Sequence, residues 1–224
     1  DGVSVTGTMK TSAGSLDFTN SNVLDTEGYV TFSKDGISIE SRLSDDGTYG
    51  VKLLPGVYSV SASYEMYDVA VDSIQQFSFY QYDVTISSDQ VIDVIFPVTT
   101  ITGKVTDNSG NNLENVGMGF TGSSNDNASD FGSFATFFTD EQGVFSVDFV
   151  SPPENWIFDF DGYQNNLGFY SNVQIYPPDN SGYFETGISD FDPRIPLNIV
   201  LASLEYDGVS VTGTMKTSAG SLDF

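Results

Sequence analysis

Residues 1–18 read DGVSVTGTMKTSAGSLDF, and residues 207–224 read the same eighteen letters again. Within this stretch, residues 3–9 alternate apolar and polar side chains, the period of a half-buried β-strand, and the turn sequence TSAG (11–14) follows. Gly7 returns as Gly213, so the sequence repeats with a period of 206 residues. A fixed period is typical of modular proteins. We therefore interpret residues 207–224 as the beginning of a second copy.

A weaker repetition lies inside the 206-residue unit. Gly7 aligns with Gly103 and Tyr49 with Phe145, both at an offset of 96 residues. A constant offset over more than forty residues indicates two diverged copies of one domain. The sequence therefore predicts one domain at 1–97, a related and longer domain at 98–206, and the start of the next repeat at 207–224.

Short alternating segments separated by turn residues continue through both domains. In the first domain they predict strands at 28–32, 36–40, 48–53, 57–62, 76–82 and 91–96. Strands at intervals of about ten residues favour a β-sandwich, and no segment carries sustained helical periodicity with caps. We expect an all-β chain of two tandem immunoglobulin-like sandwiches plus the first strand of a following repeat.

The composition excludes several classes of function. The chain is 39% hydrophobic with 18 Phe and 12 Tyr, which is too aromatic for a disordered spacer. Thirty-one acidic residues stand against seven basic ones, a net charge of -24, so we expect neither nucleic acid nor an anionic membrane as a partner. There is no His and no Cys, which removes thiol catalysis, histidine metal sites and Ser-His-Asp triads. With these residues missing, we expect no enzyme activity. No apolar run is long enough for a membrane span.

The order of strand and turn motifs resembles that of carboxypeptidase regulatory-like and collagen-adhesin B-type repeats. The matching segments are VTGTM (5–9), DDGTY (45–49) and LPGVY (54–58) in the first domain, and ITGKV (101–105), TDEQGVF (139–145) and GY (162–163) in the second. The second domain departs from the pattern at SPPENW (151–156), where a Pro-Gly turn is expected. In physical terms, Gly47 and Gly143 suit tight hairpins, Pro55-Gly56 suits a type II turn, and Tyr58 suits a core position.

The resemblance implies a transthyretin-like sandwich fold and an extracellular location in a stalk, adhesin or pilin-like subunit. It also implies that Lys104 and Asn198, on the first and last strands of the second domain, could form an isopeptide bond. The alternation around Lys104 argues otherwise, since Lys104 should face solvent beside the inward Val105.

Clusters of Asp and Asn predict candidate calcium sites, because calcium takes six to eight oxygen ligands in flexible geometry. The candidate ligands are Asp107, Asn112, Asp126, Asp130, Asp159, Asp161, Asp190 and Asp192. None belongs to a complete EF-hand loop, and the same residue types build ordinary turns. Otherwise we expect no cofactor. Asn127 begins the one N-glycosylation sequence, Asn127-Ala-Ser129.

Two functions remain open at this stage. The first is a structural repeat of an extracellular filament, stalk or adhesin, whose partners are copies of itself joined head to tail. Its assembly strand would be 209–215, with Val209, Val211, Gly213 and Met215, donated to a neighbouring copy or belonging to the next domain of one continuous chain. The alternative is a glycan-binding module, in which exposed aromatic residues stack on sugars at a cell surface. The aromatic set is Phe77, Phe79, Phe131, Phe134, Phe137, Phe138, Trp156, Tyr163, Tyr170 and Tyr183. Half of such residues in strands point inward and only fill the core.

Overall fold

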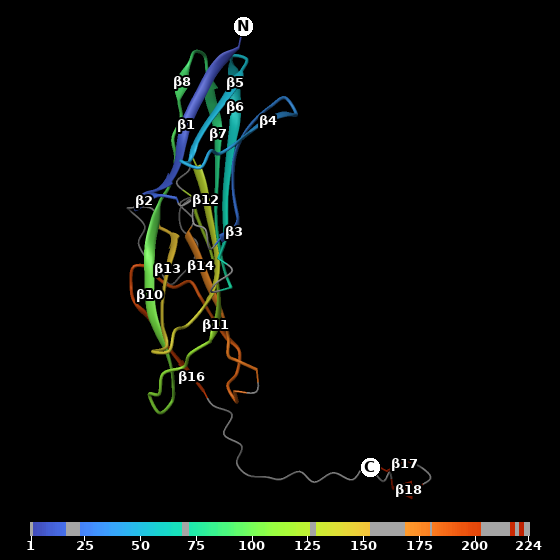
Figure 1. Cartoon of the computed structure of the whole chain (residues 1–224), viewed down its shortest axis with the longest axis vertical. Coiled ribbons are helices and arrows are strands. Elements are labelled where there is room, and N and C mark those ends of the chain that lie inside the picture. Colours follow the sequence, from blue (N-terminus) through green and yellow to red (C-terminus); the bar gives the residue numbers. More distant parts are fainter. Residues whose placement is uncertain are drawn as a thin grey trace.

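All the regular elements that the structure describes are β-strands. This computed structural model describes residues 2–16, 23–68, 72–125, 129–152, 169–179 and 181–202, together with the backbone of 216–217 and 220–221. The strands run along the long axis of an elongated molecule (Figure 1). The expected all-β fold is therefore confirmed.

The first sandwich has a small sheet built around strand β1 (Val3–Thr11). Strand β5 (Thr48–Leu53) pairs antiparallel with it, and the short strands β8 (Gln90–Val91) and β9 (Val94–Phe96) pair with it in parallel. β2 (Gly14–Ser15) folds back on the end of β1. The alternating opening stretch thus forms the central strand of its sheet.

The second small sheet repeats this arrangement. Strand β10 (Val98–Asp107) lies between antiparallel β13 (Val144–Val150) and parallel β16 (Leu197–Leu201). Gly7 lies opposite Tyr49 in the first sheet, and Gly103 lies opposite Phe145 in the second. The two registers agree at the offset of 96 residues that the sequence shows.

A single eight-stranded antiparallel sheet covers both small sheets. Its strand order is β15-β14-β11-β12-β7-β6-β3-β4. The bounds are β3 (Val23–Lys34), β4 (Ile37–Arg42), β6 (Gly56–Asp68), β7 (Ser73–Ile86), β11 (Gly117–Asn125), β12 (Ser129–Phe138), β14 (Phe169–Tyr176) and β15 (Thr186–Ser189). Strands β3, β4, β6 and β7 belong to the first half of the chain, and β11, β12, β14 and β15 belong to the second half. The two halves are therefore joined by the β7–β12 pairing, from Ser129↔Gln81 to Thr136↔Ile74.

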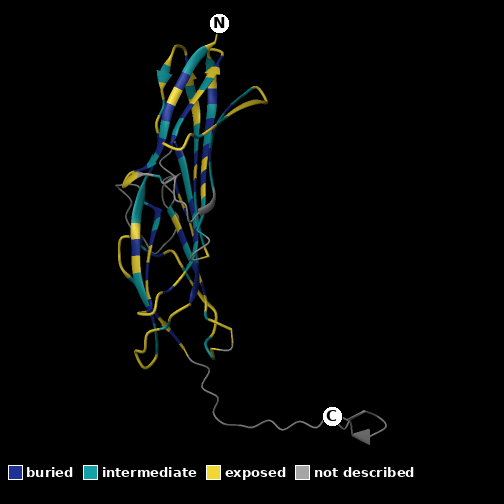
Figure 2. Cartoon of the chain, viewed as in Figure 1, coloured by how far each residue is buried: buried dark blue, intermediate teal, exposed yellow. Residues whose placement is uncertain are grey.

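Two hydrophobic cores fill the spaces between the large sheet and the small sheets. The first contains Phe32, Tyr64 and Phe96, and the second contains Phe120 and Phe149, all almost fully buried. Along the strands, buried and exposed positions alternate (Figure 2). Phe131, on β12, packs against both cores. The separate cores fit two sandwich units, while the division at residue 97 stays a prediction because one sheet passes through both halves.

Some local expectations need correction. Gly47 and Gly143 adopt φ of 77° and 70°, as tight turns require. These turns are not hairpins, because β4 and β5, like β12 and β13, belong to different sheets. Gly56 is not among the glycines with positive φ and instead begins β6, so the expected type II turn at Pro55-Gly56 is wrong. Tyr58 is buried, and its hydroxyl donates to the Leu54 carbonyl oxygen at 2.7 Å, which closes this corner in another way.

Only two short strands are described in the repeated tail, β17 (Lys216–Thr217) and β18 (Gly220–Ser221). They pair as Lys216↔Ser221 and Thr217↔Gly220, the register of Lys10↔Ser15 and Thr11↔Gly14 shifted by one period. The expected assembly strand, with Val209, Val211, Gly213 and Met215, lies outside the described residues.

Candidate functional site

Asp107 uses its carboxylate to hold its own turn. One oxygen, Oδ1, accepts the backbone N–H groups of Ser109 and Asn111, both at 2.8 Å, and Oδ2 accepts the Asn111 side-chain amide at 2.8 Å. The side-chain bond from Asn111 is the main cause that lowers the pKa of Asp107 below its ordinary value. Asn112 forms a backbone bridge with Thr106. These two candidate calcium ligands therefore act as turn residues.

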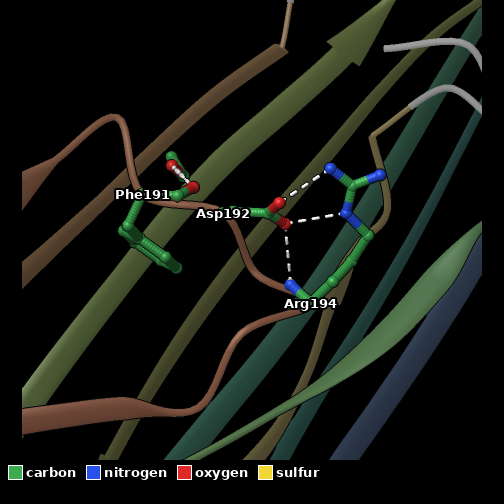
Figure 3. Close-up of polar contacts among 4 residues, drawn as sticks. Phe191, Asp192 and Arg194 are labelled. Carbon is green, nitrogen blue, oxygen red and sulfur yellow. Dashed lines mark hydrogen bonds and ion pairs between the residues drawn. The ribbon is translucent and has the colours of Figure 1, made fainter. Parts of the chain in front are cut away.

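Asp192 forms a salt bridge with Arg194 (Figure 3). Its carboxylate accepts the Arg194 Nε–H at 2.8 Å, the Arg194 Nη2–H at 2.7 Å and the Arg194 backbone N–H at 3.0 Å. The guanidinium bonds lower the pKa of Asp192 and raise that of Arg194. Asp190 has a φ of 56°, and its backbone N–H donates to the Ser171 carbonyl oxygen. The Asp192 carboxylate is therefore bonded within its own loop, next to the buried Phe191.

The structure gathers no metal centre in the part of the chain that it describes. No group of three or more His, Cys, Asp or Glu side chains there is close enough to hold an ion. Asp130 lies on β12, opposite Asn125 and Tyr80. Asp126, Asn127, Asp159 and Asp161 fall outside the described residues. Calcium binding at all of the candidate positions, and glycosylation at Asn127, stay predictions.

Two carboxylates that the sequence did not single out attach a distant segment to β1. The Ser4 backbone N–H donates to Asp89 Oδ1 at 2.8 Å, and the Thr8 N–H and hydroxyl both donate to Asp93 Oδ1 at 2.9 Å. These bonds flank the short parallel strands β8 and β9, where the ladder with β1 is interrupted. The sequence signal was weak, since Asp89 and Asp93 occur in an ordinary Ser-Asp and Ile-Asp context.

Asp93→Asn should therefore lower stability in a pH-dependent way. The bonds donated by Thr8 hold the pKa of Asp93 below its ordinary value, so the charged form stabilises the fold. This contribution is present above the unfolded pKa of about 4 and is lost as the pH falls through the lower folded value. The carboxylate is largely solvated, so we expect a loss of only about 1 kcal/mol at pH 7.

Urea unfolding of wild type and Asp93→Asn between pH 7 and pH 2.5 measures this difference, with the exposed turn variant Asp45→Asn as the control. The gap should be constant down to about pH 4 and then close. A gap that persists unchanged at the acidic end would show that the charge at Asp93 plays no part.

Lys104 and Asn198 are brought together on neighbouring strands. They are direct register partners of β10 and β16. Their neighbours Val105 and Ile199 point into the second core, so Lys104 and Asn198 lie on the solvent side of the small sheet. The geometry thus supplies the pairing that the resemblance implies, without the buried setting that such a bond would need.

The aromatic set divides between core and surface. Phe77 and Phe79 are buried in the first core, and Phe137 packs against the second, while Phe138 and Tyr170 are about half exposed. Trp156 and Tyr163 lie outside the described residues. On the outer face of the large sheet, a shallow groove of about 410 Å³ crosses the β7–β12 pairing; its lining includes Tyr29, Phe134, Glu65 and Gln76.

The junction between the two halves is the most extensive feature that the sequence did not predict. Besides the β7–β12 ladder, the Phe79 and Phe131 rings lie 5.3 Å apart across it. Gln75 Nε2 on β7 donates to the Asp148 carbonyl oxygen on β13 at 3.1 Å. We call these contacts the seam. Its ladder, ring contact and hydrogen bond all join the first half of the chain to the second.

Comparisons with known proteins identify no family. No protein-family model matches the chain, and no curated protein matches it. Among solved structures, the chain is similar to the TIE protein of Bacillus anthracis, at 16% identity over 90% of this chain and 33% of that one, with a TM-score of 0.28. It is also similar to a candidate adhesin from Bacteroides ovatus, at 12% identity over 84% and 82% of the two chains, with a TM-score of 0.33.

A third similar structure is the shaft pilin SpaA from Lactobacillus rhamnosus GG, at 10% identity over 91% of this chain and 98% of that one, with a TM-score of 0.35. The chain spans only a third of the length of the Bacillus anthracis protein. These likenesses are too remote to bear on function. Within the described residues, no helix has the length and apolar character that crossing a membrane requires.

Proposed function

We propose that this chain is the repeating unit of an extracellular filament, stalk or adhesin, and that it supplies length and linear assembly rather than catalysis. The observation that carries the proposal is the repetition itself. Residues 207–224 restart the sequence of 1–18 after one period of 206 residues. Repetition of a whole unit at a fixed period is typical of one-dimensional arrays.

The fold supports this role. Two sandwich units, each with its own core, are joined by the backbone pairing of β7 with β12, and the strands run along the long axis of an elongated molecule (Figure 1). Such a junction resists bending better than a flexible linker, because eight strands form one hydrogen-bonded sheet. The net charge of -24 favours solubility in a crowded surface layer.

The resemblance to carboxypeptidase regulatory-like and collagen-adhesin B-type repeats points in the same direction. We place copies of the chain as head-to-tail partners, either in one continuous polypeptide or through donation of strand 209–215. A glycan-binding module is the second candidate, and the outer-face groove with Tyr29 and Phe134 is the observation that favours it.

Chains of one, two and four consecutive copies of residues 1–206 test the structural role. X-ray scattering and electron microscopy should show a maximum dimension that grows linearly with copy number at constant cross-section. A compact particle, whose dimension grows far more slowly, would contradict it. Binding on a glycan array that is lost in Tyr29→Ala and Phe134→Ala, without linear growth, would favour the second candidate.

A further inference from the structure

The eight-stranded sheet ends in two edges that face no other strand within the described residues. One edge is β4, where five of six residues are exposed, including Ile37 at 68% and Ile39 at 36%. The hairpin formed by β3 and β4 projects from the side of the molecule (Figures 1 and 2). The other edge is β15, where three of four residues are exposed. A free edge is a template for pairing with another chain.

The seam shows how such an edge is used within this chain. The four strands of the first unit run in the order β4-β3-β6-β7, and those of the second run in the order β12-β11-β14-β15. Each unit thus repeats one four-strand pattern, in which β4 corresponds to β12 and β7 to β15. At the seam, the last strand of the first pattern, β7, pairs with the first strand of the second, β12.

Hydrogen bonding confirms the correspondence of β4 and β12 in detail. The Leu43 N–H donates to the Gly28 carbonyl at the end of β4, and the Thr139 N–H donates to the Val116 carbonyl at the end of β12, 96 residues later. Successive residues of an antiparallel strand direct their backbone N–H and C=O groups to opposite sides. Leu43 bonds to β3, so Ser38 and Glu40 direct theirs outward, away from β3. The equivalent residues of β12, Phe134 and Thr136, direct theirs toward β7. On β15, Asp190 bonds inward to Ser171, so Gly187 and Ser189 point outward.

We propose that β15 of one copy pairs antiparallel with β4 of the next copy, so that one sheet runs through the whole array. This inference rests on the proposed structural role and names the contact that would join the repeats. Strand directions alternate throughout the eight strands, and the alternation continues correctly when β4 follows β15. The partner is therefore a second copy of this chain.

The faces of the two strands match across the proposed contact. Ile39 lies opposite the buried Phe32, so Ile37 and Ile39 are on the core side of the sheet. Ile188 of β15 lies opposite the buried Val173 and packs against the second core, so it is on the same side. In the second unit, the positions equivalent to Ile37 and Ile39 are Ser133 and Ala135, which are buried beside the seam. Pairing would cover the two exposed isoleucines in the same way.

Charge also favours this hairpin as the contact. The chain is strongly acidic, but the segment 34–42 is neutral, since Lys34 and Arg42 balance Asp35 and Glu40. β15 is flanked by the acidic residues Glu185 and Asp190. A neutral hairpin that carries Lys34 and Arg42 is repelled less by this acidic edge than most of the acidic surface would be.

Cysteine pairing in a chain of two consecutive copies of 1–206 tests the contact, because the natural sequence has no Cys. Ser189→Cys in the first copy is combined with Ser38→Cys, Glu40→Cys or Arg42→Cys in the second, which covers the three registers that use outward positions. One of the three chains should form an intramolecular disulfide in nearly full yield, since paired strands place Cα atoms at a distance that a disulfide spans. The control places Ser189→Cys and Glu40→Cys in the same copy, on opposite edges of the sheet, where no disulfide should form.

A further variant separates backbone pairing from mere proximity. The variant is Glu40→Pro in the Ser38→Cys or Arg42→Cys chain and Ser38→Pro in the Glu40→Cys chain. Each removes one outward N–H and leaves the inward bonds of β4 to β3, so it should reduce the yield at least tenfold in whichever chain forms the disulfide. No disulfide in any of the three chains would overturn the proposed contact. If the two-copy chains still have about twice the maximum dimension of a single copy in X-ray scattering, the structural role stands and only the contact is wrong. If they are compact, the structural role fails as well.

Discussion

Replacing Gly103 with alanine should destabilise the second unit by about 3 kcal/mol or more, which is a large effect for the addition of one methyl group. A Cβ at Gly103 would overlap the Leu197 carbonyl oxygen of β16 and the Phe145 ring of β13. Both neighbours are fixed, since β16 and β13 are the two strands paired with β10. The strands would have to separate to make room.

Gly7→Ala should have the same effect on the first unit. There the added Cβ would overlap the Ile92 carbonyl oxygen and lie 2.8 Å from a carbon of the Tyr49 ring. Tyr49 cannot easily move, because its hydroxyl donates to that same Ile92 carbonyl at 2.6 Å. Gly50→Ala is the matched control on the adjacent strand, since its nearest contact would be Thr6 Cγ2 at an ordinary 3.6 Å.

Thermal unfolding of the three variants measures the difference. For a chain of this size, 3 kcal/mol corresponds to a fall in Tm of roughly 10 °C for Gly7→Ala and Gly103→Ala. Gly50→Ala should stay within about 2 °C of wild type. Equal melting temperatures for all three variants would mean that the glycine and its aromatic neighbour are not closely packed.

The sequence was informative where local pattern decides the structure. The alternation of 3–9 and 101–105 predicted the central strands β1 and β10, and Gly47 and Gly143 predicted the tight turns before β5 and β13, although these turns join two sheets and are not hairpins. The 96-residue offset also matched Tyr49 with Phe145, and the structure places each of them opposite a glycine. These features depend on strand period, turn conformation and duplication, all of which are written locally.

The seam could not be predicted in this way. β7 and β12 are separated by more than forty residues, and alternation alone does not tell a strand which edge it will join. The seam residues Gly132 and Ser133 also resemble turn residues in sequence. For the acidic residues, the sequence predicted candidate calcium ligands but not the bonds that Asp107 and Asp192 form within their own turns, and calcium binding there stays a prediction.

The β7–β12 pairing is the second feature for which we expect a large effect. Alternation directs the N–H groups of Gln76 and Ser78 toward β12, while those of Phe77 and Phe79 point toward β6. If the two units were separate, Gln76 and Ser78 would lie on a free edge. In the continuous eight-stranded sheet, their amides donate hydrogen bonds to β12 and exchange only when the seam opens.

Hydrogen exchange at single-residue resolution on the dilute single-copy chain tests this most directly, with the outward amides of Ser38 and Glu40 as the free-edge reference in the same molecule. The amides of Gln76 and Ser78 should exchange at least about a thousandfold more slowly than that reference, at rates close to those of Phe77 and Phe79. Exchange of Gln76 and Ser78 at the rate of Ser38 and Glu40 would contradict the single continuous sheet.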